Sequence, residues 1–192
     1  MTGSGIDRPL DVQRAEFARR RFLAMPLAGT LAWSVVGVSG LVLPDRTTVL
    51  VLFVATGMIA YLGMFLSKFT GEHFLDRTRP KNTFDALFFQ TVGMSLLVYA
   101  IAIPFFMADH TSLPLSVGVL SGLMWLPMSW LLQHWVGIAH AAARTVAVTA
   151  AWFLFPASRF VAIPVVIVAL YLAVIAVLEA RWRRLSGADA LA

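Results

Sequence analysis

The stretch FLAMPLAGTLAWSVVGVSGLVL, residues 22–43, decides the fold class because it contains no charged side chain. At a rise of about 1.5 Å per residue, a helix of this length crosses the hydrocarbon core of a bilayer, which is roughly 30 Å thick. Pro44, Asp45 and Arg46 follow it and are typical of a turn. We therefore interpret residues 22–43 as the first transmembrane helix.

The composition of the chain agrees with a membrane protein. Of its 192 residues, 59% are hydrophobic and 13% are charged, and the mean hydropathy is +0.81. A soluble domain of this size could not bury so much apolar surface, because surface-to-volume scaling limits its core. The chain has no cysteine, which excludes disulfides, thiolate metal sites and cysteine nucleophiles.

Further apolar runs bring the expected number of spans to about six. They cover residues 49–66, 86–107, 115–132, 136–155 and 160–178. The last break within residues 115–155 is placed at Gln133, His134 and Trp135, because the whole run is long enough for two crossings. We expect an all-α transmembrane bundle over residues 22–178, preceded by a segment 1–21 and followed by a tail 179–192.

The distribution of basic residues predicts the orientation of this bundle. With six spans, twelve of the 15 lysines and arginines fall on one side of the membrane, namely Arg8, Arg14, Arg19, Arg20, Arg21, Lys68, Arg77, Arg79, Lys81, Arg181, Arg183 and Arg184. The other side has Arg46 and Arg159. Because cytoplasmic segments carry the excess of basic residues, we expect both termini in the cytoplasm. We expect the protein itself in the inner membrane of the cell. The same clustering beside spans argues against a nucleic-acid partner, despite the net charge of +5.

An ionisable pair in the span 136–155 is the first candidate site. His140 and Arg144 lie four residues apart and therefore on one face of the expected helix. A charged residue at this depth costs about 2.5–3.5 kcal/mol on insertion scales, so it needs a cavity, a partner or a path to the surface. One interpretation is a site for an anion or a headgroup lined by both side chains. The other is an arginine that extends to the cytoplasmic surface.

Pro127, Trp130 and Gln90 complete the candidate substrate-binding residues. Proline kinks a helix and frees backbone carbonyls, and an aromatic wall beside the kink could hold an apolar or cationic ligand. Pro127 could equally shape the packing alone. Gln90 could form a hydrogen bond between helices instead of contacting a solute.

Small residues predict where helices approach each other closely. Gly137, Ala141 and Thr145 recur every four residues in the span 136–155, and Gly118 and Gly122 form a GxxxG motif in the span before it. Small side chains allow the close packing that holds helices together in lipid. We therefore expect the span 136–155 at the buried centre of the bundle. The GxxxG motif could serve packing within the chain or a homodimer.

Possible catalytic side chains gather in the longest loop, where Glu72, His73 and Asp76 are close in sequence. This cluster and the pair Asp109–His110 each fall short of the three or four convergent ligands that a metal site needs. The chain also lacks the HExxH, GxSxG, P-loop and Rossmann motifs. We expect solvated loop charges paired with neighbouring arginines, and no catalytic residue, metal or cofactor.

Two stretches carry a resemblance to a known family. They are GVLSGLMWLPMSWL, residues 118–131, and EFARRRFLAMPLAGTLAW, residues 16–33. Both resemble a family of small bacterial multi-pass membrane proteins of unknown function. The resemblance implies a standalone bacterial membrane module and assigns no catalytic or binding residue.

Three functions fit these observations. The first is a small-solute transporter or channel-like binding protein, arranged as a monomer or homodimer, with Arg144 near the solute. The second is a non-catalytic accessory protein that recognises another membrane protein through its small-residue faces. The third is a membrane-embedded lipid-modifying enzyme with Glu72, His73 and Asp76, or His140, as acid–base groups. A cavity that reaches Arg144 would favour the first function, and a cleft around the loop carboxylates would favour the third.

Overall fold

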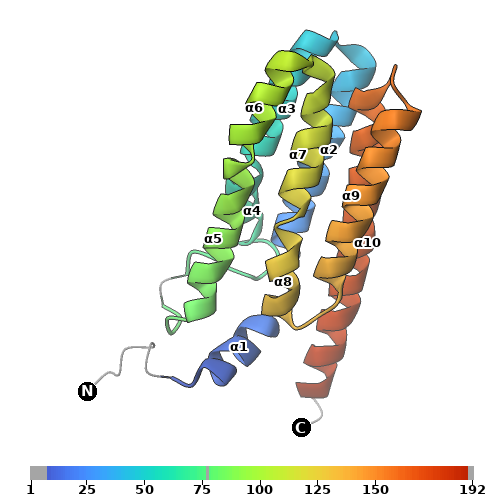
Figure 1. Cartoon of the computed structure of the whole chain (residues 1–192). Helices are drawn as coiled ribbons and strands as arrows, with labels where there is room; N and C mark the ends of the chain where they lie inside the picture. Colours follow the sequence, from blue (N-terminus) through green and yellow to red (C-terminus); the bar gives the residue numbers. More distant parts are fainter. Residues whose placement is uncertain (1–7, 77, 190–192) are drawn as a thin grey trace.

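The computed structural model is a bundle of helices joined by turns and by one longer connection, residues 67–82 (Figure 1). It describes residues 8–76 and 78–189, and this part of the chain contains no strand. The helices are α1 (Leu10–Ala18), α2 (Ala24–Val42), α3 (Asp45–Gly57), α4 (Ile59–Leu66), α5 (Thr83–Leu97), α6 (Tyr99–Ala108), the 3-10 turn η2 (His110–Ser112), α7 (Leu113–Gly122), α8 (Trp125–Leu132), α9 (Val136–Leu154) and α10 (Arg159–Asp189). The predicted all-α bundle is confirmed.

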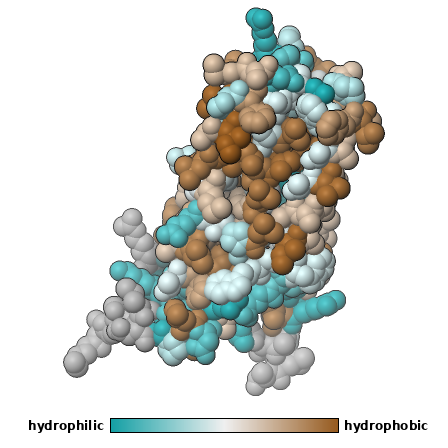
Figure 2. Space-filling view, viewed as in Figure 1, coloured by the Kyte–Doolittle hydropathy of each residue, from teal (hydrophilic) through white to brown (hydrophobic). Residues whose placement is uncertain are grey.

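The long apolar helices indicate a multi-pass membrane protein. Five stretches are long and apolar enough to cross a bilayer: α2, α5 with α6, η2 with α7 and α8, α9, and α10. A sixth crossing results if α3 and α4 form one span, because together they pass the same test with a bend of 45°. Figure 2 shows hydrophobic residues over the middle of one face and hydrophilic residues toward its two ends.

A threonine and a glycine lie at the bend between α3 and α4. The Thr56 hydroxyl donates a hydrogen bond to the backbone oxygen of Leu52 at 2.6 Å. Such bonds from threonine to the preceding turn bend helices. Gly57 follows directly and offers no side chain to resist the change of direction.

Two helices extend beyond the apolar runs of the sequence, and polar side chains support both extensions. α5 begins at Thr83, earlier than the expected span, because the Asn82 side chain accepts a hydrogen bond from the Phe84 N–H at 2.9 Å. α10 continues past residue 178 to Asp189, supported by a salt bridge between Glu179 and Arg183 at 2.9 Å. The N-terminal segment also contains a helix, α1. Hydropathy did not indicate these extensions because they are polar.

α2 and α10 pack along each other through glycines. An added Cβ at Gly29 would lie 2.6 Å from the ring of Tyr171, and one at Gly40 would lie 2.6 Å from the backbone oxygen of Phe160. Because real Cβ atoms do not approach so closely, these positions require glycine. The close approach of the first and last long helices closes the bundle in Figure 1.

α9 is not the buried centre that its small residues suggested. One face of α9 carries Gly137, Ala141 and Arg144 into the bundle, where all are buried. The opposite face leaves Val146 70% exposed and Phe153 68% exposed, as expected for side chains that face lipid. The row of small residues marks one packed face of the helix, not a helix packed on all sides.

The connection from α8 to α9 is a tight turn with close backbone contact. Gln133 ends α8 in the left-handed region with φ of 51°. A Cβ added at Gly137 would lie 2.4 Å from the backbone oxygen of Trp125 and 2.7 Å from the backbone nitrogen of Ser129. Gly137 thereby allows the first turn of α9 to lie against α8.

We expect Gly137→Ala to destabilise the protein by about 1–3 kcal/mol, because the methyl group would push the backbones of α8 and α9 apart. Gly93→Ala is the matched control, since nothing lies within 4 Å of an added Cβ at that position. Thermal unfolding of both variants in detergent checks this expectation. Equal midpoints for the two variants would contradict the close contact.

Candidate functional site

A buried arginine lies in the middle of the bundle. Arg144 is about 12 Å along the axis from the first residue of α9, at 1.5 Å per residue. Its exposed fraction is 0%. The side chain therefore does not extend to the membrane surface, which was one of the two interpretations of the sequence.

Groups from two neighbouring helices hold the guanidinium. Nε donates to the backbone oxygen of Gly118 at 2.7 Å, and Nη2 donates to Oγ of Ser121 at 3.0 Å, both on α7. Nη1 donates to the hydroxyl of Tyr171 on α10 at 2.8 Å. An arginine side chain has five N–H donors. Three of these N–H groups bind described residues, so two have no partner among the described residues.

Within the described residues, no carboxylate neutralises this cation. The ion pairs of these residues all lie elsewhere, and none includes Arg144. The rings of Tyr171 and Trp33 lie near the guanidinium, with centroids 5.1 Å and 5.8 Å from Cζ. Aromatic faces attract cations but carry no negative charge. The centre of the bundle therefore has a net positive charge.

The glycines of α7 make room for this arginine. A Cβ added at Gly122 would lie 2.8 Å from Cδ of Arg144, and one at Gly118 would lie 3.2 Å from Val148. The GxxxG motif thus packs against α9 inside the chain. It receives the stem of Arg144 and offers the Gly118 carbonyl as an acceptor.

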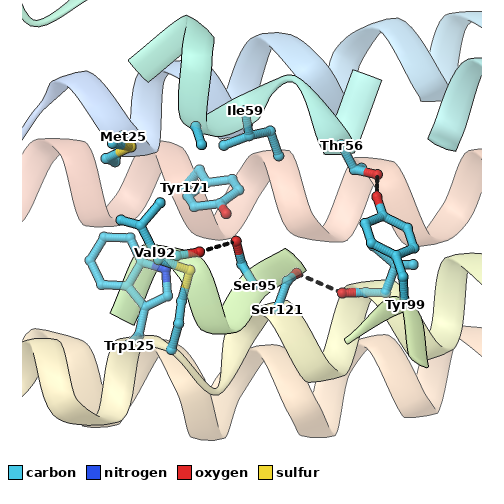
Figure 3. Close-up of a pocket in the computed structure, with 12 residues that line it drawn as sticks. Met25, Thr56, Ile59, Val92, Ser95, Tyr99, Ser121, Trp125 and Tyr171 are labelled. Carbon is cyan, nitrogen blue, oxygen red and sulfur yellow. Dashed lines mark hydrogen bonds between the residues drawn. The ribbon is translucent and has the colours of Figure 1, made fainter. Parts of the chain in front are cut away.

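Two residues that bind the arginine, Ser121 and Tyr171, also line a small cavity, which Figure 3 shows. Its volume accessible to water is about 40 Å³, which suits roughly three water molecules. Its wall is mainly apolar, but five of its twelve lining residues carry a hydroxyl group, namely Thr56, Ser95, Tyr99, Ser121 and Tyr171. Ser121 and Tyr171 also accept hydrogen bonds from Arg144. Arg144 therefore lies one hydrogen bond away from the cavity.

His140 forms part of an aromatic group beside the arginine. Its ring stacks on Tyr171 with centroids 5.2 Å apart, and Trp125 lies 4.8 Å away. The imidazole is 3% exposed. Neither of its nitrogens has a hydrogen-bond partner among the described residues. His140 therefore fixes the ring of Tyr171 by packing.

The structure places the other candidate binding residues away from this cavity. Gln90 is exposed on α5. Trp130 is 53% exposed and carries the guanidinium of Arg14 over its ring, 3.7 Å from the centroid. Pro127 is half-buried in α8 and does not line the cavity, whereas Trp125 does. Of the two tryptophans beside Pro127, Trp125 lines the cavity and Trp130 does not.

Tyr171 is the main site residue that the sequence analysis missed. It is the only hydroxyl-bearing residue in the run FVAIPVVIVALYLAVIAVL, residues 160–178. That isolation was the available signal, since a polar atom in an apolar span needs a partner. Its partner lies on another helix, and sequence spacing alone does not indicate that contact.

Glu72 is not a solvated loop charge, contrary to expectation. Its carboxyl is buried, and Oε1 accepts hydrogen bonds from the N–H groups of Leu23 and Ala24 at 2.7 and 2.8 Å. It thus caps α2, whose first N–H groups would otherwise lack acceptors. Burial raises the pKa of the Glu72 carboxyl, while the backbone hydrogen bonds and the charge of Arg21 oppose this shift.

The loop residues therefore do not converge on one catalytic centre. His73 and Asp76 line an open cleft of about 710 Å³ at the end of the bundle. Asp76 pairs with Arg79 at 3.5 Å, while Arg77 lies outside the described residues. Glu72 does not line this cleft and turns into the bundle instead. The described residues also contain no group of three His, Asp or Glu that could hold a metal.

We expect Tyr171→Phe to lower the free energy of unfolding by about 1.5–3 kcal/mol, because the charged guanidinium loses an acceptor. Tyr61→Phe is the control, since Tyr61 is 60% exposed on α4. Unfolding in detergent, followed by circular dichroism, measures both variants. Equal losses in the two variants would show that the Arg144–Tyr171 bond adds no stability.

The raised pKa of Glu72 predicts a pH dependence of stability. Because the folded state binds this proton more tightly than the unfolded state, ionisation costs stability as the pH rises from about 4.5 through the folded pKa. Glu72→Gln keeps an oxygen that can accept from Leu23 and Ala24. We expect the variant to gain stability relative to the native protein between about pH 4.5 and neutrality.

Thermal midpoints across this pH range measure the difference between Glu72→Gln and the native protein. Glu16→Gln serves as the control, because the Glu16 side chain is 48% exposed. Parallel pH profiles for Glu72→Gln and the native protein would contradict the raised pKa.

The sequence model of one protein family matches residues 12–181 of this chain, from within α1 into the last part of α10. This family is described as a family of unknown function (DUF7010). No curated protein and no solved structure matches the chain. The match covers α2 to α9 and most of α10, including Arg144 and all the residues that line the cavity.

Proposed function

The chain belongs to this family of unknown function, and we propose that it binds a small anion beside Arg144 and carries it across the membrane. The observation that carries the proposal is a buried cation without a carboxylate partner in the described residues, hydrogen-bonded to the hydroxyl of Tyr171, a residue that lines a small cavity. A buried charge is costly unless it is paired. An anion in the cavity would supply the missing charge.

Tyr171 provides the donor for such an anion. Its oxygen accepts a hydrogen bond from Arg144, so its own O–H is available to donate. A hydroxyl that accepts from a cation becomes a stronger donor, because hydrogen bonds in a chain polarise one another. Ser121 instead donates to the backbone oxygen of Val117 at 2.6 Å. We therefore assign Tyr171 to direct contact with the anion and Arg144 to charge compensation.

The cavity size restricts the solute. A volume of about 40 Å³ fits a halide or an anion of a few atoms, such as nitrate or formate, and is too small for a metabolite. Larger ligands occupy pockets of roughly 300–1,000 Å³. The proposed solute is therefore a small monovalent anion.

Methionines offer a passage from the cavity toward the end of the bundle that contains Glu72. A second cavity of about 20 Å³ shares Met25, Met124 and Trp125 with the first and is also lined by Glu72. Methionine side chains are flexible and repack easily. Rotation of Met25 and Met124 would join the two cavities without moving a helix.

The charge distribution supports an orientation in a bacterial inner membrane. In Figure 1, α1, the 67–82 connection and the end of α10 lie at the same end of the bundle. These segments, together with Arg8 and residues 19–21 that flank α1, hold all the described lysines and arginines except Arg46, Arg144 and Arg159. Under the positive-inside rule, this end faces the cytoplasm.

A binding experiment tests the proposal. The purified protein in a neutral detergent is titrated with sodium salts of chloride, bromide, nitrate and formate, with gluconate holding the ionic strength constant. A ligand that binds only the folded state raises its stability by about 2.7 kcal/mol at a hundred times its dissociation constant. We expect a saturable rise in the unfolding midpoint for one or more of these anions.

Two variants make the result specific. Arg144→Gln should abolish the rise in the midpoint, whereas Arg46→Gln should keep it. Arg46 is exposed at the start of α3, at the opposite end of that helix from Thr56. Anion flux into proteoliposomes should follow the same order. The proposal fails if no anion shifts the midpoint, or if Arg144→Gln responds as strongly as Arg46→Gln.

A further inference from the structure

A second cluster of positive charge lies at the end of the bundle, away from Arg144. Arg19, Gln133, His134, Arg181 and Arg184 line a cleft of about 430 Å³, which we call the Arg181 cleft. It lies between the end of α1, the turn from α8 to α9, and the last part of α10. No acidic side chain of the described residues lines it.

Backbone groups position Arg181 in this cleft. Its Nη2 donates to the carbonyl oxygen of Ala18, at the end of α1, and to that of Leu132, at the end of α8. Its Nη1 is buried and has no partner among the described residues. The two backbone carbonyls thus fix the guanidinium in the wall of the cleft.

The nearby carboxylates are already engaged elsewhere. Glu179 pairs with Arg21 at 2.8 Å and with Arg183 at 2.9 Å. Glu16 pairs with Arg8 at 2.6 Å. Because these acids are neutralised by other arginines, Arg181 and Arg184 keep their positive charge without a carboxylate partner in the described part of the chain.

His134 adds a neutral donor. Burial and the charge of Arg181 lower the pKa of its imidazole, so the ring is uncharged at neutral pH. Its Nδ1 accepts from the N–H of Val136 at 3.3 Å. A neutral imidazole with Nδ1 as acceptor carries its proton on Nε2, which can donate to an oxygen atom.

Aromatic residues place the cleft at the membrane surface. Trp135, next to His134, is 62% exposed, and Trp182, next to Arg181, lies under the guanidinium of Arg21 at 4.7 Å. Tryptophan is enriched where a membrane meets water. Basic pockets at this level on the cytoplasmic side bind phosphate-bearing headgroups.

We propose that the Arg181 cleft binds a phosphate group, carried by an anionic phospholipid or by a soluble phosphate. Arginine suits this ligand because its planar fork matches phosphate oxygens in two parallel hydrogen bonds. Arg181 and Arg184 supply the charge, and His134 and Gln133 supply neutral polar groups. The site is separate from the Arg144 cavity and does not depend on anion transport.

The test uses the full chain in maltoside detergent, with gluconate as the background anion. The unfolding midpoint is measured against phosphatidylglycerol, against dioleoylglycerol, which lacks the phosphate, and against sodium phosphate. A saturable rise with phosphatidylglycerol alone assigns the phosphate to a lipid. A rise with sodium phosphate as well shows that the site also takes soluble phosphate.

Arg184→Gln removes an exposed side chain of the cleft, and Arg183→Gln removes its neighbour, which does not line it. Loss of a hydrogen bond to a charged group weakens binding by about tenfold or more. We expect this loss of affinity in Arg184→Gln and unchanged affinity in Arg183→Gln. The proposal is overturned if neither phosphate source shifts the midpoint, or if the two variants bind with equal affinity.

Discussion

A guanidinium inside an apolar bundle must find its hydrogen-bond acceptors within the protein, and this requirement organises the centre of the structure. Arg144 reaches from α9 to acceptors on α7 and α10. Apolar side chains in lipid gain little by packing against one another instead of against lipid tails. Directional bonds from one cation therefore fix the relative positions of these three helices more strictly than apolar packing does.

This arrangement depends on residues that have no side chain. Gly122 leaves space for the stem of Arg144, and Gly29 leaves space for the ring of Tyr171. The first long helix thus sets the position of the hydroxyl that the arginine binds. The close approach of α2 to α10 and the polar contact between α9 and α10 are two parts of one packing solution.

Hydropathy was enough to predict the fold class, because an uncharged apolar run as long as residues 22–43 has few stable structures other than a transmembrane helix. The single charge within such a run also identified Arg144. Its acceptors could not be predicted, because Gly118, Ser121 and Tyr171 come from helices whose register against α9 leaves no local pattern. Glu72 was misjudged for the same reason, since it caps a helix that begins 48 residues earlier.

Charge pairing contributes to the positive charge of the Arg181 cleft and of the bundle centre. Asp85 pairs with Arg20, and Glu179 pairs with Arg21 and Arg183. These acidic residues at the basic end are therefore neutralised by arginines of the N-terminal segment and the tail. Among the described residues, Arg181 and Arg184 in the cleft and Arg144 farther along the bundle then have no carboxylate partner. Positive potential in low-dielectric surroundings attracts anions over several ångströms. The proposed anion, arriving from the basic end, would therefore meet attraction both at the surface and at the centre, with the small methionine-lined cavity between them.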